Sequence, residues 1–252
     1  MIRTLLIITG ASLVLCAAAL GGAGALGGND LARHGWTWTF RDHGDGHEET
    51  VRFERADRGP RVTRTLAWDG SDRLDIDVAA FVTYVQGDEA SVEVSGPQNQ
   101  IDRLRLSGGR LTFDEDDDNV EVVVFGRRHN DRIRITVTAP SVRSFNLSSS
   151  GDLVIRDYDQ PSLAVSINGS GEVVATGRTE TVDLDISGLG EADLSGLETR
   201  DADIDISGSG EAAVGPTGAA RITISGSGDV DLTRRPVSLS QNISGSGDVS
   251  QR

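Results

Sequence analysis

The second half of the chain repeats one short motif, and this repetition limits the folds that the chain can adopt. The motif reads apolar residue, small polar residue, glycine, serine, glycine, acid, with small departures in single copies. Its six copies occupy residues 147–152, 167–172, 186–191, 206–211, 224–229 and 243–248. The copies follow one another at steps of 20, 19, 20, 18 and 19 residues. A nearly constant step this short is typical of structural units that stack on one another.

The residues around each motif alternate between polar and apolar. Segments 183–186 and 203–206 alternate aspartate with leucine or isoleucine, and Val173 and Ala175 continue this period after a motif. Such a period predicts strands with one buried face, so each unit is predicted to be strand, turn, strand. One unit cannot bury its own apolar face, whereas stacked units form a continuous core with strands about 4.8 Å apart. We therefore expect an all-β parallel β-solenoid of about six C-terminal coils of about 19 residues, and not a series of antiparallel hairpins.

The glycine before each acid is predicted to be a structural turn. A sharp corner between two strands requires a positive φ, which glycine adopts without a steric clash. The predicted turn residues are Gly151, Gly171, Gly190, Gly210, Gly228 and Gly247.

Charge and composition exclude several functions. The net charge of −15 argues against nucleic acid as a partner, because phosphates require a cationic surface. The sequence contains no lysine, which removes Schiff-base and P-loop chemistry. The single cysteine, Cys16, lies in an apolar N-terminal stretch, so the rest of the chain has neither a disulfide nor a cysteine-based zinc site.

The N-terminus resembles a targeting segment. Arg3 precedes an apolar run, and small residues at 17–19 or 23–25 offer a cleavage site. We expect residues 1–28 to be a signal peptide or an N-terminal membrane anchor, and 29–63 to be a strand or stalk region. The solenoid domain is expected over 64–249, including alternating strands upstream of the repeats. This organisation predicts export to the periplasm, the outer membrane or the cell surface.

The order of these segments resembles the head GIN domain family of auto-transporter adhesins, a bacterial domain of unknown function. The resemblance is carried by the strand block through 85–88, by 94–96 followed by 111–113, by 137–140 and by the repeated motif. It implies a right-handed single-stranded parallel β-helix on an exported protein with a role in adhesion. The implied partner is a glycan or protein of the cell surface or envelope. The resemblance supplies no catalytic residue and no cofactor.

Stacking in register would place the six motif acids in one column. Hard cations such as Ca²⁺ bind several oxygen ligands and would relieve the repulsion between neighbouring carboxylates. The alternative is a solvated edge, and the 19-residue period differs from the nine-residue period of calcium β-rolls. The candidate ligands are Asp152, Glu172, Glu191, Glu211, Asp229 and Asp248.

Three other polar clusters are interpreted as exposed loops. They are the acidic run 114–118, the pair His43 and His47, and His129. Runs of acids between strands are usually solvated, and two histidines four residues apart are a weak metal signal.

We expect a non-catalytic binding module. The alternatives are a carbohydrate-active β-helix enzyme, because paired carboxylates can cleave a glycosidic bond, and a purely structural or regulatory envelope protein. The motif acids recur with the period of the fold, which a structural role predicts and a single active site does not. The last coil, around Ile243 and Val249, is expected to lack a polar cap and to mediate pairing with a second copy.

Overall fold

The computed structural model describes residues 36–41, 48–55, 60–114, 120–125 and 132–251. The expected targeting segment 1–28, His43, His47, His129 and residues 115–118 of the acidic run lie outside these ranges. The chain divides into two compact units, and each is described by itself. None of the helices in the described ranges has the length and apolar character needed to cross a membrane.

The first unit is built around a three-stranded sheet. Its strands are β1 (Trp36–Arg41), β2 (Glu48–Arg55) and β9 (Val120–Phe125). Strand β2 pairs antiparallel with β1 and parallel with β9. In sequence, β9 falls between strands of the second unit, so the chain returns to the first unit once.

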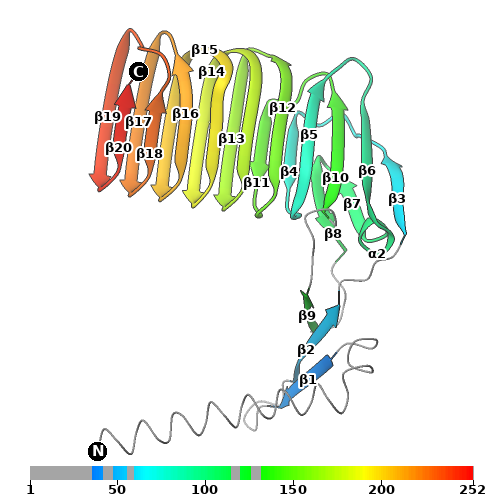
Figure 1. The fold of residues 1–252 in the computed structure, drawn as a ribbon. Helices are drawn as coiled ribbons and strands as arrows, with labels where there is room; N and C mark the ends of the chain where they lie inside the picture. Colours follow the sequence, from blue (N-terminus) through cyan, green and yellow to red (C-terminus); the bar gives the residue numbers. More distant parts are fainter. Residues whose placement is uncertain (1–35, 42–47, 56–59, 115–119, 126–131, 252) are drawn as a thin grey trace, which may run out of the picture. The chain divides into compact units, whose positions relative to one another are not determined.

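The second unit is a parallel β-solenoid with two walls (Figure 1). The first wall consists of β4 (Arg73–Ile76), β11 (Ser144–Leu147), β13 (Ser162–Gly169), the second half of β14 (Glu172–Gly188), the second half of β15 (Glu191–Gly208), β17 (Ala219–Gly226) and β19 (Ser238–Gly245). The second wall consists of β5 (Ala80–Gln86), β12 (Asp152–Asp159), the first halves of β14 and β15, β16 (Glu211–Pro216), β18 (Asp229–Leu232) and β20 (Asp248–Gln251).

Neighbouring strands within each wall run parallel. This holds from β4 to β19 on the first wall and from β5 to β20 on the second. The stacked arrangement predicted from the constant repeat spacing is therefore confirmed, and the hairpin alternative is wrong. The repetitive part forms about five turns, slightly fewer than the six coils expected, because six corners bound five intervals.

The end of the second unit that comes first in sequence has a different construction. Strand β10 (Ile133–Ala139) pairs parallel with β5 and antiparallel with β6 (Ser91–Pro97), which pairs antiparallel with β3 (Arg61–Leu66). On the other wall β8 (Arg110–Phe113) pairs parallel with β4 and antiparallel with β7 (Leu104–Ser107). The short helix α2 (Gln98–Ile101) follows β6 and buries Ile101. Both walls thus end in antiparallel strands at this end.

The core consists of apolar columns that run along the solenoid between its walls. Ile204, for example, is buried and pairs with Leu184 on one side and Ile222 on the other. This stacking follows directly from the period of two, because every second side chain of each strand points inward. Near the start of the repeats, the ring of Phe145 lies between those of Tyr84 and Tyr158, with ring centroids 5.0 and 6.4 Å away in edge-to-face geometry. The buried Tyr84 hydroxyl donates a hydrogen bond to the carbonyl oxygen of Ala139, 2.8 Å away.

The two glycines of the motif differ in backbone conformation. Gly208, the first glycine of its copy, has a φ of 134°, and Gly188, Gly226 and Gly245 have similar values. The predicted corner glycines lie at turns, but none of them has a positive φ, so that part of the prediction is wrong. They are Gly151, Gly171, Gly190, Gly210, Gly228 and Gly247.

The second glycine of the motif is required by space and not by φ. A Cβ on Gly210 would lie 2.6 Å from Cγ2 of Ile186 and 2.7 Å from the carbonyl oxygen of Gly190, both in the preceding coil. Most other copies show the same close approach to the side chain of the preceding coil. The position therefore lets the corner of one coil sit directly on the apolar residue of the coil below.

The last coil carries glutamine at two inward positions. Gln241 continues the column of Ile222, and Gln251 continues that of Leu232. Apolar residues remain at the other inward positions of this coil, where Leu239 and Val249 pack against the core. This coil therefore presents two amides among its inward positions.

Candidate ligand-binding face

The six motif acids stand in one column on the second wall. The register pairs each acid with the next, from Asp152 and Glu172 through to Asp229 and Asp248. Because the inward positions are filled by aliphatic residues, these carboxylates point to solvent, and all except the half-buried Asp152 are exposed. Neighbours about 4.8 Å apart repel by on the order of 1 kcal/mol in water. The column is therefore tolerated because it remains hydrated.

The ends of this column differ in charge. Asp152 accepts a hydrogen bond from Arg132, with 2.6 Å between Nη1 and Oδ2. Among the residues that the structure describes, Glu191, Glu211 and Asp248 form no ion pair. These three carboxylates thus present their negative charge to the solvent.

A second polar row lies two residues further along the same strands. It contains Asp193, Ala213, Asp231 and Ser250 in neighbouring register. The row was not predicted as part of a site, although the period of two that predicts the strands also predicts that these residues face outward. Asp193 accepts hydrogen bonds from the backbone N–H and the hydroxyl of Ser195, at 3.0 and 2.6 Å.

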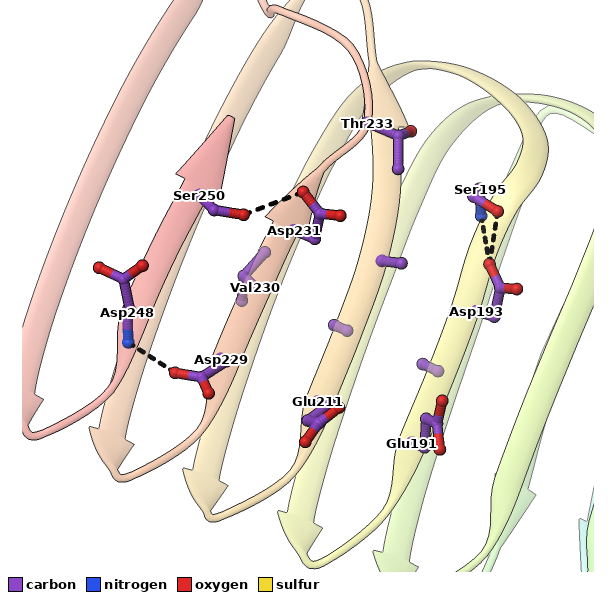
Figure 2. Close-up of a pocket in the computed structure, with 13 residues that line it drawn as sticks. Glu191, Asp193, Ser195, Glu211, Asp229, Val230, Asp231, Thr233, Asp248 and Ser250 are labelled. Atoms are coloured by element: carbon purple, nitrogen blue, oxygen red, sulfur yellow. Dashed lines mark hydrogen bonds between the residues drawn. The ribbon is translucent and has the colours of Figure 1, made fainter. Parts of the chain in front are cut away.

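The two rows line a shallow hollow on the second wall (Figure 2). Ala213 forms part of its floor, because its methyl group is the smallest outward side chain between Asp193 and Asp231. Hydrogen bonds link adjacent coils along the hollow. The Ser250 hydroxyl donates to Oδ1 of Asp231 at 2.9 Å, and the backbone N–H of Asp248 donates to Oδ1 of Asp229 at 2.9 Å. The hollow contains carboxylates, hydroxyls and small apolar residues, and its lining includes no aromatic residue.

The first wall carries its own group of four aspartates. Asp183 pairs in register with Asp203, and Asp185 pairs with Asp205. Partial burial raises the pKa of Asp183 above its usual value, and the nearby charges of Asp203, Asp185 and Asp205 raise that pKa further. The fifth residue of this cluster is Arg221, whose Nε lies 3.9 Å from Oδ2 of Asp203.

The motif acids and the first-wall aspartates are spread along the coils. Among the described residues, no group of three or more Asp, Glu, His or Cys side chains could hold a metal ion. Of the acidic run 114–118, only Asp114 is described, and it forms an ion pair with Arg105. No catalytic group was predicted, and the motif acids are brought together as a row and not as a pocket around one point.

Comparison with known protein families identifies the fold. The family "Putative auto-transporter adhesin, head GIN domain" matches residues 72–236, which is more than half of the chain. The chain belongs to this family. The match begins just before β4 and ends shortly after β18, so the head GIN domain matches both walls of the solenoid. The resemblance stated from the repeated motif is confirmed.

A solved structure with the same fold is also described as an adhesin. A "putative adhesin" from Bacteroides fragilis NCTC 9343 shares 17% identity with this head GIN protein at a TM-score of 0.58, covering 79% of this chain and 100% of the other. A "putative adhesin" from Parabacteroides merdae ATCC 43184 shares 15% identity at a TM-score of 0.42, covering 79% and 99%. A comparison with curated proteins gave no match. At 17% identity, the similarity to the Bacteroides fragilis structure shows the fold of this chain and nothing about its function.

Proposed function

We propose that this head GIN protein is an exported, non-catalytic adhesion module that binds a glycan of the cell surface or envelope in the hollow of the second wall. Membership of a family described as adhesins supports the adhesion role. The Arg3-led apolar segment at the N-terminus supports export. We choose this surface because two polar rows run along it across several coils, around Ala213.

The chemistry of the hollow favours a ligand rich in hydroxyl or ammonium groups. Carboxylate oxygens accept hydrogen bonds from both, and bonds to a charged acceptor are stronger than neutral ones. Uronic and sialic acids would be repelled by Glu191, Glu211 and Asp229. The centres of protein–protein interfaces are enriched in aromatic residues and depleted of charge, whereas this lining has the opposite composition. We therefore assign neutral glycans or amino sugars as the ligand class.

Binding of the exported chain to an array of neutral, amino and acidic glycans tests this function. We expect signals from neutral or amino glycans and none from acidic ones. The double variant Asp193→Asn and Asp231→Asn should weaken binding about tenfold or more, because it removes two charged acceptors from the hollow. Ala213→Leu should also weaken binding, since it fills the floor without changing the charge.

The matched control removes the same number of charges from the first wall. The variant Asp185→Asn with Asp205→Asn should bind like the unmodified chain. Equal losses in both double variants would show a general charge effect and contradict the assignment to the second wall. Release of sugar from any bound polysaccharide would contradict the non-catalytic role, and capture of proteins but no glycan would contradict the ligand class. Fractionation of the expressing cells checks export.

A further inference from the structure

The outer edges of the last coil have no partner strand in the described part of the chain. Strand β19 pairs with β17, and β20 pairs with β18, each on one side only. The free edge of a strand exposes a row of backbone N–H and C=O groups that can pair with another strand. β19 is the longer of the two edges, with eight residues.

Strand β19 carries none of the features that usually prevent edge pairing. Edge strands are normally protected by charged side chains, by proline or by bulges. β19 has the sequence Ser-Leu-Ser-Gln-Asn-Ile-Ser-Gly, with no charge and no proline, and its register with β17 is unbroken. By contrast, β3 at the other end of the unit includes Arg61 and Arg64. In a chain with a net charge of −15, the uncharged β19 is an edge at which two copies would meet without direct repulsion between its side chains.

The last coil also leaves apolar groups partly open to solvent. Ile243 is 36% exposed, whereas Ile206 at the same motif position is 1% exposed. Leu239 and Val249 are only partly buried against the core. The side chain of Gln241 is exposed between Leu239 and Ile243 on the inward face. A partner strand that covered this edge would bury the side chains of Leu239 and Ile243 and would contact the amide of Gln241 between them.

We propose that the edge of β19 binds a second copy of this chain by antiparallel pairing of the two β19 strands. The period of two restricts the register, because each inward residue must lie opposite an inward residue of the second copy if the core is to continue. Pairing Leu239 with Ile243 of the second copy satisfies this rule and buries both apolar side chains. The same register places Gln241 opposite Gln241 of the second copy, on the twofold axis.

Glutamine suits this central position. Its amide is both donor and acceptor, so two copies related by a twofold axis can exchange hydrogen bonds. The same amide is also stable in water, which makes the interface compatible with a folded monomer. The dimer is therefore reversible. It is also closed, because each copy uses its β19 edge and the arginine-bearing β3 remains at the far end of each copy. This pairing does not depend on the adhesion role.

Cysteine cross-linking tests the register. In a chain with Cys16→Ser, the variant Gln241→Cys places the two thiols opposite each other, at a separation that a disulfide can span. We expect oxidation to give a covalent dimer. Asn242→Cys is the matched control, because its opposite residue is Ser240 of the second copy and the two cysteines lie apart. Cross-linking at 242 but not at 241 would overturn the register.

Sedimentation of the exported chain over a range of concentrations tests the association itself. We expect a reversible monomer–dimer equilibrium. Gln241→Lys should raise the dissociation constant about tenfold or more, because two ammonium groups would meet on the axis. Gln241→Leu should lower it, because it extends the apolar contact. Ser225→Lys on β17 adds the same charge on an exposed site away from the edge and should leave the equilibrium unchanged.

Two results would overturn the proposal. The first is a monomer at every concentration, with the β19 amides either exchanging freely with solvent or protected by another segment of the same chain. The second is growth of open chains instead of a closed dimer, which would indicate head-to-tail pairing with β3. Circular dichroism verifies that each variant is folded. Hydrogen exchange of the β19 amides in the unmodified chain tests the association without any substitution.

Discussion

The two glycines of each motif are needed for different physical reasons. Gly208 adopts a φ of 134°, where a side chain would be strained, and a Cβ would also lie 2.4 Å from the carbonyl oxygen of Gly188. Gly210 has no such φ, but it has no room for a methyl group above Ile186. The motif tolerates leucine between the two glycines, as Leu189 shows, because that position is 69% exposed. The glycine pair is thus fixed by the stacking of coils.

Replacing the space-limited glycine should destabilise the solenoid. We expect Gly210→Ala to lower the free energy of unfolding by about 1–3 kcal/mol, because the added methyl group forces the corner away from Ile186. Ser209→Ala, at the neighbouring turn position, is the control and should change stability by less than about 0.5 kcal/mol. Urea unfolding followed by circular dichroism measures both. An unchanged stability for Gly210→Ala would show that the corner can shift freely.

The raised pKa of Asp183 links one residue to the pH dependence of stability. The pKa of this carboxyl in the fold lies above its ordinary value of 3.8, first because of partial burial and then because of Asp203, Asp185 and Asp205. The folded state therefore binds the proton more tightly than the unfolded state. The free energy of unfolding falls as the pH rises from 3.8 through the raised pKa, and remains lower above it.

Removing this charge should stabilise the protein at neutral pH. We expect Asp183→Asn to raise the free energy of unfolding there by less than about 1 kcal/mol, since most of the group is solvated. The gain should shrink as the pH falls below the raised pKa. Unfolding at a series of pH values measures it, with Asp88→Asn in an exposed turn as the control. A gain that persists unchanged in acid would contradict the electrostatic explanation.

At the scale of the strand, burial depends on where a coil lies in the stack. The same motif position holds Ile206 in β15 and Ile243 in β19. Strands β14 and β17 cover Ile206 on its two sides, whereas only β17 covers Ile243 in the described chain. The sequences of the two copies are nearly the same, so this difference in burial arises from neighbours and not from local preference.

This difference predicts unequal costs for the same substitution. Ile206→Ala should lower the free energy of unfolding by about 2–5 kcal/mol, because it leaves a cavity between coils. Ile243→Ala should cost clearly less, because its side chain already contacts water. Comparison of the two denaturation midpoints at low protein concentration, where the second copy is dissociated, measures the difference. Equal costs would indicate that the last coil is covered in the monomer.

At the scale of the whole molecule, stability accumulates coil by coil. Each wall strand contacts chiefly the strands before and after it, so the solenoid resembles a one-dimensional array. In such arrays a terminal unit can be removed without loss of the rest. The two walls share one continuous core, to which the first wall contributes the column of Leu184, Ile204 and Ile222 and the second wall the column of Leu194, Val214 and Leu232.

Removal of the last coil should therefore weaken the fold and not abolish it. A chain that ends after residue 236 should remain folded, with a lower melting temperature and no dimer, because β17 and β18 then become the edges. Removal of the interior coil 201–216 brings together corners that were not neighbours. If these corners fail to match, this deletion should destabilise the fold more than removal of the last coil. Thermal unfolding and sedimentation of the truncated chain give the answer. Complete unfolding of this chain would show that the coils act as a single cooperative unit.

The sequence by itself was sufficient for the solenoid, the inward and outward faces and the column of acids. These features follow from a period of two within each strand, as in residues 183–186, and from a repeat of about 19 residues along the chain. The registers of Glu191 with Glu211 and of Ile204 with Ile222 then follow from stacking equal units.

Tertiary structure decided what depends on contacts between coils. It assigned positive φ to Gly208 and close packing to Gly210, and it placed Ala213 between Asp193 and Asp231 to form a hollow. It also gave the upstream strands antiparallel partners and left β19 at an edge. None of these outcomes is contained in a single repeat, because space and exposure are set by the neighbouring coil, whose position the local period leaves open.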